Sequence, residues 1–101
     1  MDPGIPDNVM ISDVVVSTAG RDKGQWFYVI QEEPMYLYLA NGKDRQLDKP
    51  KRKKRKHVQK VLRSETRVAE KLIRGDKVLN GELRRDLAYL ASEMQANNLG
   101  G

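Results

Sequence analysis

The chain has 101 residues and a formal net charge of +5, from 19 Lys and Arg residues against 14 Asp and Glu residues. This length fits one compact domain, since domains typically hold about 100 to 150 residues. There is no cysteine, which excludes disulfides, thiolate catalysis and thiolate zinc sites. No stretch approaches the roughly 18 consecutive apolar residues of a membrane span, so we expect a soluble, cytoplasmic protein that has no membrane partner.

The first ten residues hold Pro3, Gly4 and Pro6 among polar side chains. Such a composition favours an extended segment without regular hydrogen bonds. We therefore expect residues 1–10 to form a disordered N-terminal tail.

Two strands joined by a tight loop are predicted next. Residues 14–18 (VVVST) and 25–31 (QWFYVIQ) are rich in β-branched and aromatic side chains, which favour strands. The loop between them carries Gly20 and Gly24. Gly24 suits a reversal that requires a positive φ or a close backbone approach. These features predict a β-hairpin.

Three further short strands are predicted before residue 63. Residues 35–40 alternate as MYLYLA and precede Asn41-Gly42, a strong turn signal. We expect a fourth strand at 45–48 and a fifth at 57–62, with a helix as the alternative for the last run. Five short strands leave exposed edges unless the sheet closes. The fold class expected is therefore mainly β, with a small SH3-like barrel over residues 11–62.

Two short amphipathic helices are predicted as a C-terminal extension over residues 63–95. Their apolar faces carry, at helical spacing, Val68, Ala69, Leu72 and Ile73 in the first and Leu83, Leu87, Leu90 and Met94 in the second. Ser64 is the expected N-cap of the first helix, and Gly75 is its expected C-terminal stop. Asn80 is the expected cap of the second helix, which should fray from residue 97. Because so small a barrel buries little surface, we expect both helices to pack on it.

A strongly basic run, KPKRKKRKHVQK, occupies residues 49–60. It holds eight of the 19 basic residues and no acidic one, so the other 89 residues carry a net −3. A block of like charge repels itself and persists where a polyanion compensates it. This run of positive charge therefore predicts nucleic acid as the first partner. The alternative is a solvated loop that only confers solubility.

The segment VVVSTAGRDKGQWFYV at residues 14–29 resembles the KOW motif of ribosomal proteins and transcription elongation factors. That motif has two apolar strands around a tight turn that ends in Lys-Gly. The ANGKDRQLDKP stretch with its basic continuation, and a last helix that opens with Asn80 and Glu82, extend the likeness over about residues 11–90. Together they resemble bacterial KOW-domain RNA-binding proteins related to a large-subunit ribosomal protein of archaea and eukaryotes. One departure is Leu79, where a Thr or Ser would begin a capping box with Glu82.

The resemblance implies an SH3-like barrel that binds structured RNA, with ribosomal RNA and ribosomal proteins as the partners. We expect no cofactor, no metal and no small-molecule substrate. The expected RNA-binding residues lie in the hairpin loop and the basic run: Arg21, Lys23, Gly24, Lys49, Lys51, Arg52, Lys53, Lys54, Arg55, Lys56, His57 and Lys60. Asp22 is expected to pair with one of the two cations that flank it.

Four aromatic side chains offer a second kind of contact. Strand parity places the core residues Phe27, Val29, Leu37 and Leu39 on one face and Trp26, Tyr28, Tyr36 and Tyr38 on the other. The four outward rings are candidates for stacking on unpaired bases. The alternative is that the C-terminal helices cover them, because a ring such as Trp26 is costly to leave in water.

Three classes of function compete. A noncatalytic RNA-binding protein is the first, and a protein-interaction module of the elongation-factor kind, contacting RNA polymerase, is the alternative. An enzyme is the least supported, because no carboxylate pair, nucleophile with a base or metal cluster is apparent, and His57 is the only imidazole. We favour RNA binding because the positive charge is concentrated on one segment beside the predicted hairpins.

Overall fold

The structure is a computed structural model that describes residues 8–100, and the side chains of residues 8–96. Its five strands form one antiparallel sheet: β1 Asp13–Ser17, β2 Trp26–Glu32, β3 Tyr36–Ala40, β4 Lys51–Lys54 and β5 Val58–Arg63. The strand order is β4-β3-β2-β1-β5, so β4 and β5 are the two edges. A short 3₁₀ helix, η1 Arg55–His57, connects these edges, and the helices α1 Arg67–Arg74 and α2 Asn80–Gly100 follow.

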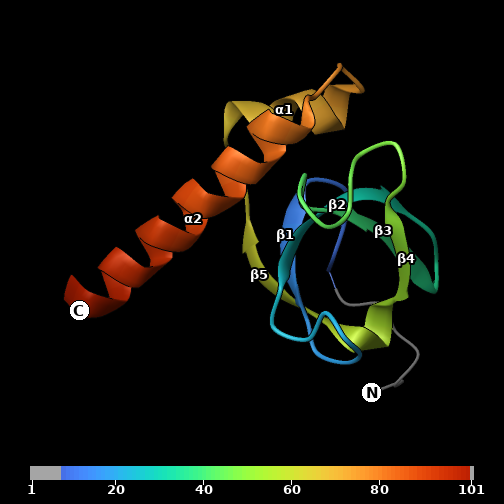
Figure 1. The fold of residues 1–101 in the computed structure, drawn as a ribbon, viewed down its shortest axis with the longest axis horizontal. Helices are drawn as coiled ribbons and strands as arrows, with labels where there is room; N and C mark the ends of the chain where they lie inside the picture. The colour runs from blue at the N-terminus through green and yellow to red at the C-terminus, as the bar shows by residue number, and fades with distance from the viewer. Residues whose placement is uncertain (1–7, 101) are drawn as a thin grey trace.

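The sheet is strongly curved but open (Figure 1). Its ladder shifts register between Val14 and Val15 against β5, and between Val29 and Gln31 against β3. Such irregularities bend a strand and increase its twist. The expected small β-rich fold with two C-terminal helices is confirmed. The expected closure is not observed, because β4 and β5 pair with β3 and β1 and not with each other.

Two hydrophobic clusters lie on opposite faces of the sheet. The inner cluster contains Val9, Val15, Phe27, Val29, Leu37, Leu39 and Val58. The outer cluster lies between the sheet and the two helices and contains Val14, Tyr28, Ala40, Val68, Ala69, Leu83 and Leu87. The predicted core side of β2 and β3 is therefore confirmed. The helices lie outside the curved sheet (Figure 1). They share one buried cluster with its outer face.

The described end of the N-terminal segment is ordered, in contrast to its prediction. Residues 1–7 lie outside the described residues. Val9 is only 3% exposed and belongs to the inner cluster, and the backbone N–H of Met10 donates to the Asp13 carboxylate at 3.0 Å. The expected disorder up to residue 10 is therefore wrong for these two residues, because the core of the curved sheet takes up the Val9 side chain.

The fourth strand was predicted at the wrong place. Residues 42–49 form bends and turns, and β4 lies inside the basic run at Lys51–Lys54. The Asn41 carboxamide oxygen organises the preceding loop by accepting the backbone N–H groups of Lys43 and Arg45. Pairing of β4 with β3 uses backbone groups, so charged side chains do not prevent it, and they are common on edge strands.

The helix ends follow the prediction in part. Gly75 ends α1 in the left-handed conformation, with a φ of 78°, as predicted. The N-cap is Thr66 and not Ser64: the Thr66 hydroxyl oxygen accepts the N–H of Ala69 at 3.2 Å, whereas Ser64 is buried against the Tyr28 hydroxyl at 2.7 Å. The backbone of α2 stays helical to Gly100, so the fraying predicted from residue 97 is not observed; residue 101 lies outside the described residues.

The start of α2 also differs from its prediction. Asn80 is the first residue of the helix, and its side-chain oxygen accepts the backbone N–H of Leu47 at 2.8 Å instead of capping the helix. The Glu82 carboxylate accepts the N–H of Leu79 at 3.0 Å. Half of a capping box therefore forms without the Ser or Thr that usually completes it. No helix of the described residues is both long and apolar enough to cross a membrane.

Candidate nucleic-acid interface

A buried ion-pair cluster centred on Asp22 fastens the β1–β2 loop to β4. Asp22 is 8% exposed and Lys53 is 7% exposed. The Lys53 ammonium group donates to Asp22 Oδ1 at 2.6 Å and to the carbonyl of Ala19 at 2.7 Å. Lys51 lies 2.8 Å from Asp22 Oδ2, and the Ser17 hydroxyl donates to Oδ1 at 2.7 Å. Asp22 thus pairs with the basic run, and not with Arg21 or Lys23 as predicted.

This cluster sets the protonation state of Asp22. Burial alone would raise the pKa of the carboxyl group, but the hydrogen bonds from Lys51, Lys53 and Ser17 outweigh burial and hold the pKa well below its usual range. Asp22 is therefore ionised at neutral pH. Its single negative charge is shared by Lys51 and Lys53, two of the cations that the sequence suggested for phosphate binding.

The alternation of β4 divides the basic run into two sets. Lys53 and Lys51 pair with Leu37 and Leu39 of β3 and share their inner side, where they reach Asp22. Arg52 and Lys54 point to the opposite side, and both are exposed. A prediction made from the run as a block could not separate the two sets, because it placed no strand there.

Two further cations of the predicted set are held by the protein itself. Arg55 donates to the carbonyl groups of Glu33 and Val9, both at 2.9 Å, and lies 3.8 Å from the Glu32 carboxylate. Lys60 lies 3.3 Å from the buried carboxylate of Asp13. These contacts tie η1 to the N-terminal segment and β5 to β1. Arg55 and Lys60, which the sequence suggested for RNA binding, therefore also support the fold.

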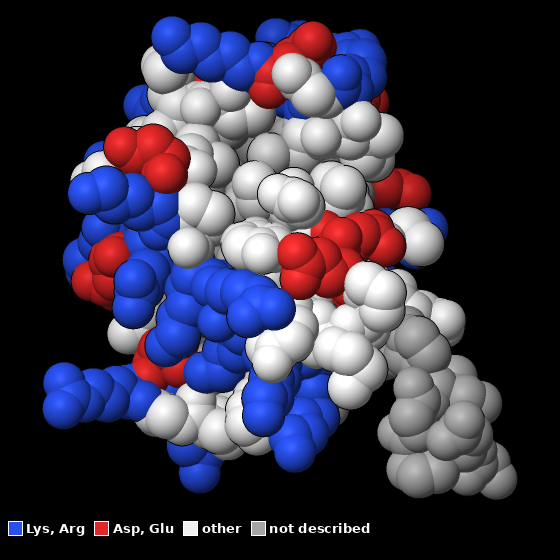
Figure 2. Space-filling view, turned by 90° about the vertical axis from the view of Figure 1, so that its right-hand side faces the viewer, with Lys and Arg blue, Asp and Glu red and all other residues white. Residues whose placement is uncertain are grey.

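Five cations of the predicted set remain without an acidic partner. They are exposed, and no ion pair joins them to any described residue: Arg21, Lys23, Lys49, Lys54 and Lys56. We call these five residues the free cations. On the face shown in Figure 2, Lys and Arg side chains gather in the lower part, and acidic side chains lie near the middle of the face and among the cations on its left.

The four aromatic side chains that the sequence suggested for base stacking also divide, because those of β2 are more covered than those of β3. Tyr28 is fully buried under the helices and donates a hydrogen bond to the Asp86 carboxylate, so it cannot stack on a base. Burial, and then this hydrogen bond, raise the pKa of Tyr28 well above its usual range. Trp26 is half-buried against the same cluster. Tyr36 and Tyr38 stay half-exposed on the outer face of β3, where Tyr38 donates to Glu33 at 2.9 Å. The alternative that the C-terminal helices cover the rings therefore holds for β2 and not for β3.

The remaining predicted residues have backbone roles. Gly24 has a φ of 90°, and a Cβ atom there would meet nothing within 4 Å, so its role is the positive φ and not a close approach. The backbone carbonyl of half-buried His57 accepts the N–H of Thr18 at 2.9 Å. Sequence reasoning gave Asp22 the wrong ion-pair partners and missed Glu33, because the roles of both depend on strand pairing.

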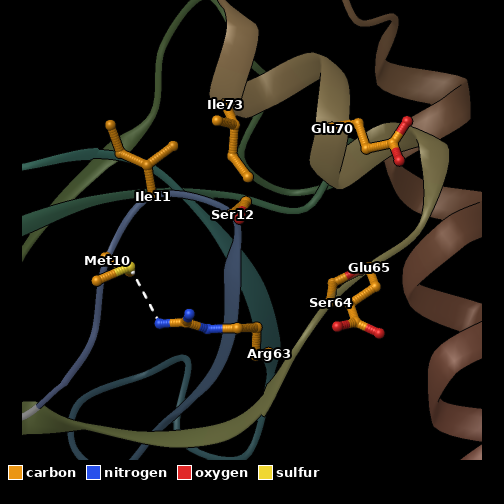
Figure 3. A pocket seen from close by; sticks show the side chains of 8 residues that line it. All are labelled: Met10, Ile11, Ser12, Arg63, Ser64, Glu65, Glu70 and Ile73. Carbon is orange, nitrogen blue, oxygen red and sulfur yellow. Dashed lines mark hydrogen bonds between the residues drawn. The ribbon is translucent and has the colours of Figure 1, made fainter.

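A separate pocket lies between the N-terminal segment, the end of β5 and α1 (Figure 3). Met10, Ile11 and Ile73 supply its apolar lining, and Arg63 reaches Met10 Sδ at 3.1 Å. Glu65 and Glu70 lie at its rim (Figure 3). Its mixed charge distinguishes it from the β4 side.

The described residues contain no group of three or more His, Cys, Asp or Glu side chains that could hold a metal ion. Comparison with protein-family models finds no match, and comparison with curated proteins finds none either.

Proposed function

We propose that this chain is a noncatalytic RNA-binding protein that holds RNA phosphates on the β4 side of a small SH3-like fold. The resemblance to KOW-domain proteins supports ribosomal RNA as the ligand and the ribosome in the cytoplasm as the place of action. The observation that carries the proposal is the set of free cations, which come from three parts of the chain: the β1–β2 loop, the loop before β4, and β4 with η1.

Free cations are the ones that can contribute to phosphate binding. A cation that already has an acidic partner must lose that ion pair to gain a phosphate, so the exchange contributes little. A cation without a partner gains the full interaction and releases the counterions condensed on the RNA. Arg21, Lys23 and Lys54 therefore matter more to the proposed binding than the buried Lys53.

The Asp22 cluster supports the proposal in a second way. It holds the loop that carries Arg21 and Lys23 against β4 before any ligand arrives. Ordering a loop during binding costs free energy, and a loop fixed in advance avoids that cost. A module that contacts RNA polymerase is the alternative, but a set of exposed cations without acidic partners suits a polyanion better than a protein surface of mixed charge.

The salt dependence of binding tests the proposal. Fluorescence anisotropy would measure the affinity for a labelled, unstructured single-stranded RNA between 50 and 300 mM KCl. If the five free cations each neutralise one phosphate, the plot of log affinity against log salt has a slope of about −3.5, from about 0.7 per contact on a single strand. A slope shallower than about −1 would contradict phosphate binding. Crosslinking in cells and sequencing of the bound RNA would then identify the ligand.

A further inference from the structure

A planar cation lies on an aromatic ring on the outer face of β3 and β4. The guanidinium carbon of Arg52 is 3.6 Å from the centroid of the Tyr36 ring. On this face the strand register pairs Tyr38 with Arg52, and Tyr36 with Lys54. Arg52 therefore reaches diagonally across the strand pair to cover Tyr36. A separation this short is that of stacked planar groups, in which cation–π attraction adds to stacking.

Glu33 keeps the guanidinium group in this position. Its Oε1 atom lies 3.7 Å from Arg52 Nε, and its Oε2 atom accepts the Tyr38 hydroxyl at 2.9 Å. The Glu33 contact is a 3.7 Å approach to Nε, longer than a hydrogen bond, so it acts as an electrostatic restraint on the guanidinium group. One face of the plane lies on Tyr36, and the side chain of Arg52 remains 53% exposed. Because more than half of the side chain is exposed while Tyr36 covers one face, the opposite face is the side from which a ligand can approach.

We propose that this face of Arg52 stacks on an unpaired RNA base, so that Tyr36, the guanidinium group and the base form a three-layer stack. This inference rests on the proposed RNA binding and specifies the ligand as single-stranded or looped RNA. Arg planes and aromatic rings are the platforms on which proteins stack splayed bases. Within a continuous duplex both faces of a base are covered by neighbouring bases, so a duplex offers this platform nothing to stack on.

The neighbouring cation fits the same ligand. Lys54 is the next outward residue of β4, about 7 Å further along the strand, and it is one of the free cations. A nucleotide whose base lies on Arg52 then has a phosphate contact within the reach of a flexible lysine. The platform thus supplies a preference for unpaired bases, and the free cations supply most of the salt-dependent affinity.

Two ligands and two substitutions test the stack. The ligands are an unstructured 12-nucleotide RNA and an abasic strand of the same length with the same phosphates. Arg52→Lys keeps the charge and removes the plane. It should weaken binding of the intact strand about 5- to 160-fold, the range for one stacked base, and leave the abasic strand unchanged. Tyr36→Leu should weaken the intact strand as well, since the plane loses its support. Arg67→Lys, at an exposed position of α1, is the matched control and should change neither affinity.

The outcomes separate the two proposals. If wild-type protein binds the intact strand, the abasic strand and a duplex equally, with a steep salt dependence, RNA binding stands and the stack is overturned. Equal losses for both single strands in Arg52→Lys would also overturn it, since Arg52 would then act on phosphates. If no RNA binds, both proposals fail. Circular dichroism of Tyr36→Leu checks its folding, and Arg52→Lys supplies the decisive result in any case.

Discussion

Asp22→Asn is the substitution that most directly probes how β4 is attached to the β1–β2 loop. Asparagine keeps the shape of the side chain and one acceptor oxygen, but it removes the charge. Lys53, which is 7% exposed, would then keep its ammonium group in the interior with only the Ala19 carbonyl and an amide oxygen as partners. Removing one partner of a buried ion pair typically costs about 3 to 5 kcal/mol. We expect the lower end, about 3 kcal/mol, because Lys51 can turn to solvent.

The pH dependence of the loss follows from the pKa of Asp22. Folding lowers this pKa, so the ionised group stabilises the folded protein. That stabilisation is fully present above the usual Asp pKa of about 3.9 and is lost as the pH falls toward the pKa of the folded state. The difference in unfolding free energy between wild type and Asp22→Asn should therefore be constant from about pH 5 to pH 7 and shrink below about pH 4.

Urea denaturation followed by fluorescence measures both effects, because Trp26 is the only tryptophan and is half-buried at the start of β2. The double variant Asp22→Asn, Lys53→Met is the control. It removes both buried charges, so it should recover much of the stability lost by the single change. A loss of less than about 0.5 kcal/mol at pH 7 in the single variant would show that Lys53 relaxes into solvent. The ion pair would then not hold the loop.

Two other changes test the packing. Gly24→Ala should cost only the positive-φ penalty of about 1 to 2 kcal/mol, since a Cβ atom there meets nothing within 4 Å. Gly42→Ala should lower the melting temperature further, because its Cβ atom would lie 2.2 Å from the Asn80 carbonyl oxygen. Equal melting temperatures of the two variants would mean that α2 does not pack on the β3–β4 loop. Leu87→Ala should lower the free energy of unfolding by about 2 to 5 kcal/mol. It should also speed amide exchange in α2 and at Val14 and Tyr28 of the shared cluster. Exchange that rises only within the helices would show that they form a separate unit.

Short-range patterns of the sequence predicted the hairpin and the core side of β2 and β3. The alternation in β2 and β3 leaves only one way to bury Phe27, Val29, Leu37 and Leu39, and all four are buried. Gly24 and Gly75 mark positions that need a positive φ, and both adopt one. Such features depend on residues a few positions apart, which a sequence displays directly.

The division of the basic run could not be predicted in this way. It depends on β4 pairing with β3, which turns Lys53 toward Asp22 and Arg52 toward Tyr36. Asp22 is 31 residues from Lys53 in the sequence. Nothing in the local composition distinguishes Lys53 from Lys54, since both are lysines within six consecutive cations. A charge count therefore overstates how many of these residues are available to a ligand.

The most direct test of the account compares two variants that lose the same charge from different parts of the chain. One replaces four free cations, Arg21, Lys23, Lys54 and Lys56, with Gln, and the other replaces four exposed cations of the helical region, Arg67, Lys77, Arg84 and Arg85, with Gln. The account predicts that the first variant loses most of its RNA affinity and that its salt slope becomes shallower by about 3, while the second binds nearly as wild type. Equal losses in the two variants would contradict it, because binding would then follow the net charge of the protein and not the surface built around β4.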